Sequence, residues 1–107
     1  LHVPGNADGT HFITQQELEL MKPEAVLINT ARASLIDETA MVQALRQKRI
    51  YGYGTDVFDG EPHMNPEFIG LNNVVCSPHT AAVSVEAVNT MSHAAVEHLM
   101  EYFGVTK

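Results

Sequence analysis

Continuous apolar runs alternate along this chain with segments whose apolar residues fall on one face of a helix. This alternation predicts strands separated by helices. A continuous apolar run covers residues 25–31. It lacks the alternation of a half-exposed strand, so we expect a strand that is covered on both faces. Further strands are expected over 51–58 and 73–77, with a strand stub over 1–4 that Pro4 ends. These segments predict a sheet of about four parallel strands.

One-sided apolar spacing predicts three helices. Thr14 begins a capping box, which places a short helix over 15–21. Asp37 is expected to cap a second helix. Ser84 is expected to cap a long third helix over 85–103, whose apolar residues fall on one face.

The expected elements follow the order β-α-β-α-β-loop-β-α, in which a long loop over 59–72 replaces one helix. Alternation of this kind is typical of a parallel sheet with right-handed crossovers. The sequence therefore predicts an α/β fold, half of a doubly wound sheet, followed by a long helix.

Three apolar runs lead into polar residues of types that do chemistry. Arg32 follows the first long run. Asp56 lies near the end of the second run, with Glu61 just beyond it, and His79 follows the last run. Open α/β sheets bind ligands outside the carboxyl ends of their strands, so we expect these side chains to share one site.

Each candidate has a structural alternative. Arg32 suits two-point binding of a carboxylate, but it could instead pair with Asp37 or Glu38. Glu61 and His79 could form a carboxylate–imidazole couple for proton transfer. The alternative is a buried, satisfied histidine beside a surface glutamate.

Asp56 lies on a strand between glycines and is a poor choice for a core position. The alternative to a functional role is that its side chain caps a turn.

Charge and cysteine content narrow the classes of partner. The chain has 13 acidic and 6 basic side chains and a formal charge of -7, which disfavours nucleic acid and anionic membranes as partners. No apolar run reaches the roughly 18 residues of a membrane span.

The histidines lack metal-ligand spacing, so no metal site is expected. Cys76 is the single cysteine, which fits a reducing, cytoplasmic compartment, and its apolar run favours a packed position.

The chain begins without an initiator Met and without the features of a signal peptide, and we expect it to be part of something longer.

Several short motifs stand in a consistent order over residues 1–103, and together they resemble the D-isomer-specific 2-hydroxyacid dehydrogenases. The motifs are Leu1–Pro4, Leu20–Pro23 with Leu27–Arg32, Leu35–Glu38, Asp56–Phe58 with Glu61 and Pro62, and Asn73–Val75 with Ser77–His79.

The resemblance implies that residues 1–82 are the C-terminal half of a Rossmann-like domain that binds a nicotinamide dinucleotide. Residues 83–107 would form a helix leading back toward a substrate domain. In that family Arg32 would hold the substrate carboxylate and carbonyl, His79 would exchange the proton with the C2 oxygen, and Glu61 would pair with His79.

The resemblance also implies which residues line the cofactor, with Asp56 on the nicotinamide side. The implied set is Val3, Thr30, Ala31, Arg32, Asp56, His79, Thr80 and Ala81. The cofactor is expected to be NAD, and NADP is not excluded, because the sequence lacks the Gly-rich turn and acidic partner that distinguish them. Ala33 and Thr80–Ala81 depart from the family pattern, which more often has Gly after the arginine and an aliphatic residue and Gly after the histidine.

The implied function is hydride transfer between NAD(P) and a D-2-hydroxy acid or 2-oxo acid, in a parent protein that is a homodimer. Two alternatives remain open. One is a cofactor-sensing binding protein of the same superfamily, similar to a corepressor, and the other is a fragment that is inactive alone.

Overall fold

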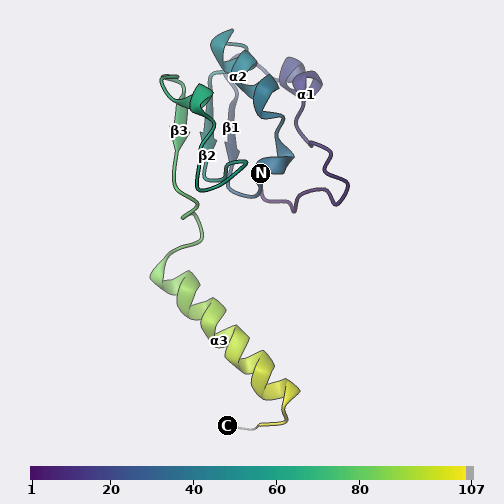
Figure 1. Cartoon of the computed structure of the whole chain (residues 1–107), viewed down its shortest axis with the longest axis vertical. Coiled ribbons are helices and arrows are strands. Elements are labelled where there is room, and N and C mark those ends of the chain that lie inside the picture. The colour runs from purple at the N-terminus through teal and green to yellow at the C-terminus, as the bar shows by residue number, and fades with distance from the viewer. Residues whose placement is uncertain (106–107) are drawn as a thin grey trace.

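Three parallel strands form the centre of the molecule, in the spatial order β1 (Val26–Asn29), β2 (Gly52–Thr55) and β3 (Val74–Cys76). The computed structural model describes residues 1–105 (Figure 1). The helices are α1 (Gln15–Leu20), α2 (Glu38–Arg46) and α3 (Val85–Tyr102), and short 3-10 turns cover Ala33–Leu35 and Pro66–Phe68. The predicted α/β fold with a parallel sheet and a long final helix is confirmed.

The strands end level with one another. Asn29 pairs with Thr55, and Thr55 pairs with Cys76. Each strand therefore delivers the segment that follows it to the same edge of the sheet.

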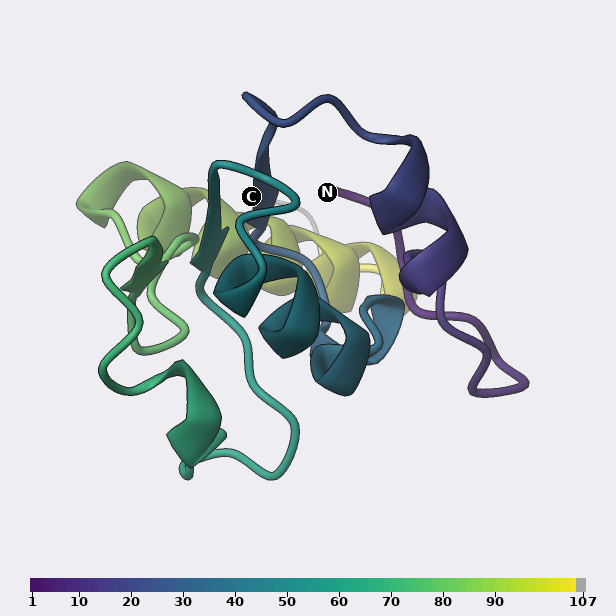
Figure 2. The ribbon, with the colours of Figure 1, turned by 90° about the horizontal axis from the view of Figure 1, so that it is seen from above.

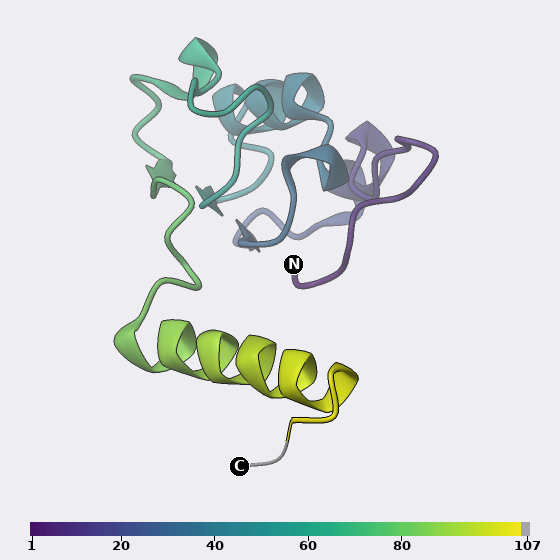
Figure 3. The same ribbon diagram turned by 60° about the horizontal axis from the view of Figure 1, so that its bottom comes forward.

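One face of the sheet carries the hydrophobic core. α1 and α2 cover this face, and Figure 3 shows α2 on one side of the strands and α3 on the other. The largest fully buried apolar side chains are Leu18, Leu35, Ile36, Met41, Val42, Leu45 and Ile50. The predicted caps are present: Thr14 and Glu17 form a capping box on α1, and the Asp37 side chain accepts from the Ala40 N–H of α2.

The other face of the sheet is bare, which corrects the prediction that the first long run is covered on both sides. Val26 is 56% exposed and Ile28 is 57% exposed. Their side chains, with Tyr51 and Val75, help to line an open hollow of about 800 Å³. The reason is that α1 and α2 lie together on one face, and no described segment packs on the other.

The sheet has three strands rather than about four. The expected stub over 1–4 is not a strand, although the amino terminus of Leu1 hydrogen-bonds to the Ile28 carbonyl of β1. Pro4 has no N–H to donate, and the described chain offers no strand on the outer side of this segment, so a ladder does not form.

α3 leads away from the rest of the molecule. Ser84 caps it as predicted, accepting from Ala87 N–H, and Gly104 follows it with φ 66°, in the left-handed region. None of its residues is buried. Viewed from above, α3 runs beneath the sheet and its covering helices (Figure 2). Residues 106 and 107, the end of the segment expected over 83–107, lie outside the described residues.

Among residues 1–105, no helix combines the length and apolar character needed to cross a membrane.

Candidate active site

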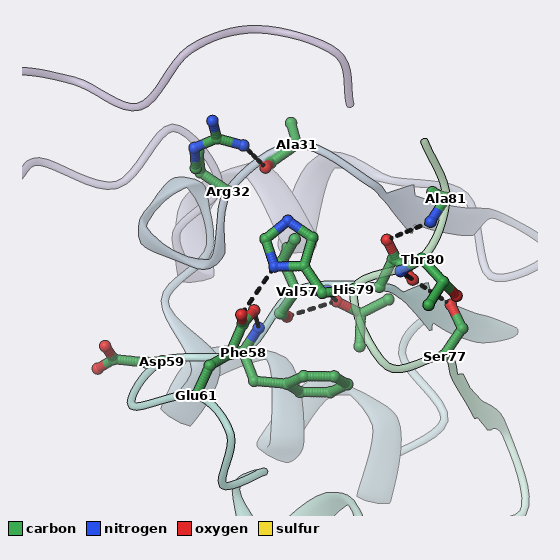
Figure 4. A network of polar contacts seen from close by, with 12 residues as sticks. Ala31, Arg32, Val57, Phe58, Asp59, Glu61, Ser77, His79, Thr80 and Ala81 are labelled. Atoms are coloured by element: carbon green, nitrogen blue, oxygen red, sulfur yellow. Dashed lines mark hydrogen bonds and ion pairs between the residues drawn. The ribbon is translucent and has the colours of Figure 1, made fainter. Parts of the chain in front are cut away.

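The level strand ends bring the candidate side chains to one edge. Arg32 comes three residues after the end of β1, and His79 comes three residues after the end of β3. Figure 4 shows Arg32, Glu61 and His79 at this edge. The local sequence thus places a cation, a carboxylate and an imidazole beside one another through strand register.

The turn that carries Arg32 is held by Asn29, the last residue of β1. The Asn29 side chain is completely buried. Its Nδ2 donates to the Arg32 carbonyl oxygen over 2.9 Å, and its Oδ1 accepts from the Ala31 N–H over 3.1 Å. Sequence reasoning did not single out Asn29, although a polar residue closing an apolar strand was a usable signal.

The Arg32 side chain is exposed and donates from a guanidinium nitrogen to the Ala31 carbonyl oxygen over 2.6 Å. The alternative pairing with Asp37 or Glu38 is wrong for the described residues, whose ion pairs are Arg46–Glu67 and Glu61–His79. Most of the N–H donors of the Arg32 guanidinium are therefore available to bind a ligand.

Glu61 and His79 form the predicted couple. The Glu61 Oε2 atom lies 2.7 Å from His79 Nδ1, and Glu61 Oε1 accepts from the Phe58 N–H over 3.0 Å. The hydrogen bond to His79 and then that from Phe58 hold the pKa of Glu61 below its usual value. The side chains of His79 and Glu61 are 51% and 34% exposed, so the alternative of a buried, satisfied histidine is wrong.

The pair leaves one ring nitrogen available. Because Nδ1 faces Glu61, the other nitrogen, Nε2, is directed elsewhere, and it has no hydrogen bond among the described residues. A histidine oriented in this way by a carboxylate can pass a proton through Nε2 to a bound molecule.

The connection that carries Glu61 is anchored to α2 and to the core. Asn65 donates to a Glu38 carboxylate oxygen over 3.1 Å, and Arg46 pairs with Glu67 over 3.0 Å. Phe68 is buried in the core. The long loop expected over 59–72 is therefore largely docked, with one short 3-10 turn in place of a full helix.

Asp56 is 2% exposed, and its carboxylate receives three hydrogen bonds from the segment after β3. Oδ1 accepts from the Ser77 hydroxyl over 2.6 Å and from the Thr80 N–H over 2.9 Å, and Oδ2 accepts from the Ala81 N–H over 2.8 Å. Burial raises the pKa of Asp56, but these hydrogen bonds outweigh it and hold the pKa below its usual value. Asp56 therefore holds a turn, which was the structural alternative for this residue. Its contact with the nicotinamide cofactor stays a prediction.

A cavity of about 540 Å³ adjoins the Glu61–His79 pair, lined also by Phe58, Met64 and Cys76. Cys76 is exposed, which corrects the prediction that it is packed, because the short strand β3 pairs with β2 on one side and with no other strand of residues 1–105. Partial burial raises the pKa of its thiol, which disfavours a reactive thiolate. Within residues 1–105, no group of three His, Cys, Asp or Glu side chains is placed to hold a metal ion.

The remaining predicted cofactor residues surround the same edge. Thr30 is half-buried, with its hydroxyl 3.3 Å from His2 Nδ1. Ala31 is buried, whereas Val3, Thr80 and Ala81 are exposed.

The chain matches a family model described as D-isomer specific 2-hydroxyacid dehydrogenase, NAD binding domain, over residues 1–81. It is 41% identical over 102 residues to a glyoxylate reductase of Thermococcus litoralis, covering 95% of this chain and 31% of that protein. It is 39% identical to a 2-ketogluconate reductase of Gluconobacter oxydans, covering 96% of this chain and 33% of that protein. The chain thus spans about a third of the length of these curated relatives.

Solved structures share the fold. An acyclic imino acid reductase in complex with NADPH and D-Arg superposes with a TM-score of 0.88 at 45% identity, over 97% of this chain and 33% of that one. An NADPH-dependent glyoxylate/hydroxypyruvate reductase of Sinorhizobium meliloti, in complex with NADP and malonate, gives a TM-score of 0.87 at 38% identity, over 95% of this chain and 32% of that one.

Proposed function

This chain belongs to the D-isomer specific 2-hydroxyacid dehydrogenases, as part of their NAD-binding domain, and we propose that it carries the acid–base and substrate-anchoring residues of a 2-oxo acid reductase. The observation that carries the proposal is the Glu61–His79 hydrogen bond at the same sheet edge as the exposed Arg32 guanidinium. A cation that anchors a carboxylate beside a histidine that can donate a proton is the set of groups that 2-oxo acid reduction requires.

The residues at this edge fit the nicotinamide end of a dinucleotide. Thr30 offers a hydroxyl and Val3 an exposed apolar side chain, while Thr80 and Ala81 are exposed residues on the segment that carries His79. We propose that these groups, with Ala31, Arg32, Asp56 and His79, line the cofactor. When bound, the dinucleotide supplies the hydride chemistry, and the protein supplies orientation and the proton.

Each catalytic side chain has a distinct task in the proposal. Arg32 binds the substrate carboxylate and polarises the carbonyl as negative charge develops on its oxygen. His79 donates the proton to that oxygen through Nε2. Glu61 keeps the ring oriented through Nδ1.

We further propose that residues 1–82 are the C-terminal half of the cofactor domain and that residues 83–107 lead toward a substrate domain. The relatives are about three times as long as this chain, which supports the proposal that the remaining parts of both domains lie elsewhere in the intact protein. In this proposal the intact protein is a cytoplasmic homodimer, and the 107-residue chain by itself reduces no 2-oxo acid. The sequence lacks a Gly-rich turn for the pyrophosphate, which supports this last point.

The test is a reductase assay on the intact protein that carries this chain, with NADH and NADPH against glyoxylate, 2-ketogluconate and other 2-oxo acids. Arg32→Ala is expected to lower kcat/KM by several orders of magnitude, about 3–5 kcal/mol, because the anchor for the substrate carboxylate and the group that polarises the carbonyl are both lost. Lys22→Ala is the control, since Lys22 is an exposed cation that precedes β1, at the end of the strand remote from Arg32. A folded protein that reduces none of these acids with either cofactor would overturn the proposal, and cofactor binding without turnover would favour a cofactor-sensing protein.

A further inference from the structure

His79 sits in a backbone conformation that needs support. Its φ is 54°, in the left-handed region that L residues other than glycine rarely adopt. Its N–H donates to the Ser77 carbonyl oxygen over 3.0 Å, which closes a tight turn. A residue held in such a conformation persists only when the surrounding contacts determine it.

The buried Asp56 carboxylate supplies those contacts. It binds Ser77 on one side of His79 and the N–H groups of Thr80 and Ala81 on the other, over 2.6 to 2.9 Å. The three donors therefore span the turn, and His79 lies between them in sequence. In Figure 4, dashed lines mark these contacts at the labelled residues Ser77, Thr80 and Ala81.

Asp56 is itself held in place. Its N–H donates to the Asn29 carbonyl oxygen of β1 over 3.0 Å, and its side chain is 2% exposed. The anchor is thus a core position rather than a mobile surface group. From this position it restrains the backbone of His79, whereas Glu61 restrains the ring.

We propose that Asp56 is a positioning residue, whose carboxylate fixes the turn over 77–81 so that His79 can bind Glu61 through Nδ1 and present Nε2 to the substrate. The catalytic consequence, presentation of Nε2 to the substrate, rests on the proposed function. The structural consequence, a fixed turn over 77–81, does not. This positioning role differs from the expected contact between Asp56 and the nicotinamide, because Asp56 holds the turn whether or not a cofactor is bound.

A carboxylate suits this task better than an amide. Both Asp56 oxygens accept, so the three donors are satisfied together. Asn in its place has one accepting oxygen and an NH₂ group, which would face either the Ala81 N–H or the Thr80 N–H as a second donor. Asp56→Asn should therefore release one side of the turn without changing the volume of the site.

The experiment measures the turn and the reaction separately, in the intact protein. Backbone amide exchange over residues 79–81 is followed without cofactor or substrate, and kcat, KM and NADH affinity are measured in parallel. For Asp56→Asn we expect exchange to speed up by about tenfold or more. We expect kcat to fall by about 10²-fold, with a smaller change in the Kd for NADH, because Asp56 is also proposed to line the cofactor.

Two further variants separate positioning from a folding defect. Ser77→Ala removes one of the three hydrogen bonds and should shift exchange and kcat in the same direction by a smaller factor. Asp59→Asn is the matched control, because Asp59 is an exposed carboxylate on the same connection, and it should leave both unchanged. Thermal unfolding of every variant checks that the fold is retained.

Unchanged amide exchange over 79–81 in Asp56→Asn would overturn the inference, whatever the activity. So would a loss of NADH affinity that accounts for the whole fall in kcat/KM, since that result would assign Asp56 to the cofactor alone. If exchange quickens as expected but the wild-type protein reduces no 2-oxo acid, the positioning role stands and the proposed function fails.

Discussion

Asn29 and Asp56 show how a single buried polar side chain can organise a site that lies beyond the end of its strand. Each is almost fully inaccessible, and each uses its side chain to bond the backbone of a turn that carries a candidate catalytic residue. Buried polar groups are tolerated where all their hydrogen bonds are made, and the described residues contain no buried side-chain N or O atom without a partner.

Asp56 should contribute stability in a pH-dependent way. Its pKa in the folded protein lies below the ordinary value of 3.8. The contribution is therefore fully present above about pH 3.8 and is lost as the pH falls through the folded-state pKa. Asp56→Asn should lower the free energy of unfolding at pH 7 by about 1–3 kcal/mol, with a smaller difference in acid. Urea unfolding at pH 7 and below pH 4 measures this, with Asp59→Asn as control, and a pH-independent difference would contradict it.

Glu61 and His79 should act together in catalysis by the intact enzyme. His79→Ala is expected to lower the rate by about 10²–10⁴-fold, because the proton donor is lost. Glu61→Gln should lower kcat, because the ring loses the carboxylate that orients it through Nδ1, and should remove the fall of activity in acid that protonation of Glu61, below its lowered pKa, would cause. Profiles of kcat/KM against pH check both, and a profile unchanged by Glu61→Gln would count against the pair.

At the scale of elements, the two longer helices have similar caps but different surroundings. Asp37 caps α2, which buries Met41, Val42, Ala44 and Leu45 against the sheet. Ser84 caps α3, which buries no residue. The same local interaction should therefore have different consequences for global stability, because only α2 is coupled to the core.

Asp37→Ala and Ser84→Ala test this coupling. Asp37→Ala should lower the free energy of global unfolding by about 1 kcal/mol, the usual value of an N-cap. Ser84→Ala should reduce the helicity of α3 while leaving the unfolding of the core unchanged. Urea unfolding followed by the NMR signals of the buried Tyr53 ring reports on the core, and far-UV circular dichroism reports on total helix. Equal losses of core stability would show that α3 is packed in solution.

At the scale of the whole molecule, apolar surface remains uncovered in two places. One is the bare face of the sheet around Val26 and Ile28. The other is α3, on which Met91, Val96 and Leu99 are each more than half exposed. The molecule is accordingly elongated, with extents of 59 × 28 × 25 Å. Contiguous apolar surface of this kind favours association.

We expect the 107-residue chain to self-associate in a concentration-dependent way. Replacing Val26 and Ile28 together by Thr should weaken association, because Thr keeps the β-branched shape but adds a hydroxyl to the bare face. Leu20→Thr is the control, since Leu20 is 85% exposed on α1, which packs on the opposite face. Size-exclusion chromatography over a range of concentrations measures the effect, and a wild-type chain that elutes as a monomer at every concentration would contradict it.

Much of the architecture followed from local sequence. The caps Thr14, Asp37 and Ser84, the order of the elements and the parallel sheet were predictable, because capping side chains act within three or four residues and apolar spacing reports which face is buried. The contact between Glu61 and His79 was predictable from the resemblance and from strand order, because parallel strands deliver their ends to one edge.

The sequence by itself determined which residues reach the sheet edge, since strand direction and order are encoded in local pattern. Other features depended on tertiary contacts. Only the tertiary structure decided that Asp56 holds the His79 turn, that Cys76 is exposed and that one sheet face is bare. The physical reason is that hydrogen-bond partners 21 to 25 residues apart, and the packing of a face, depend on how the elements are placed against one another in space.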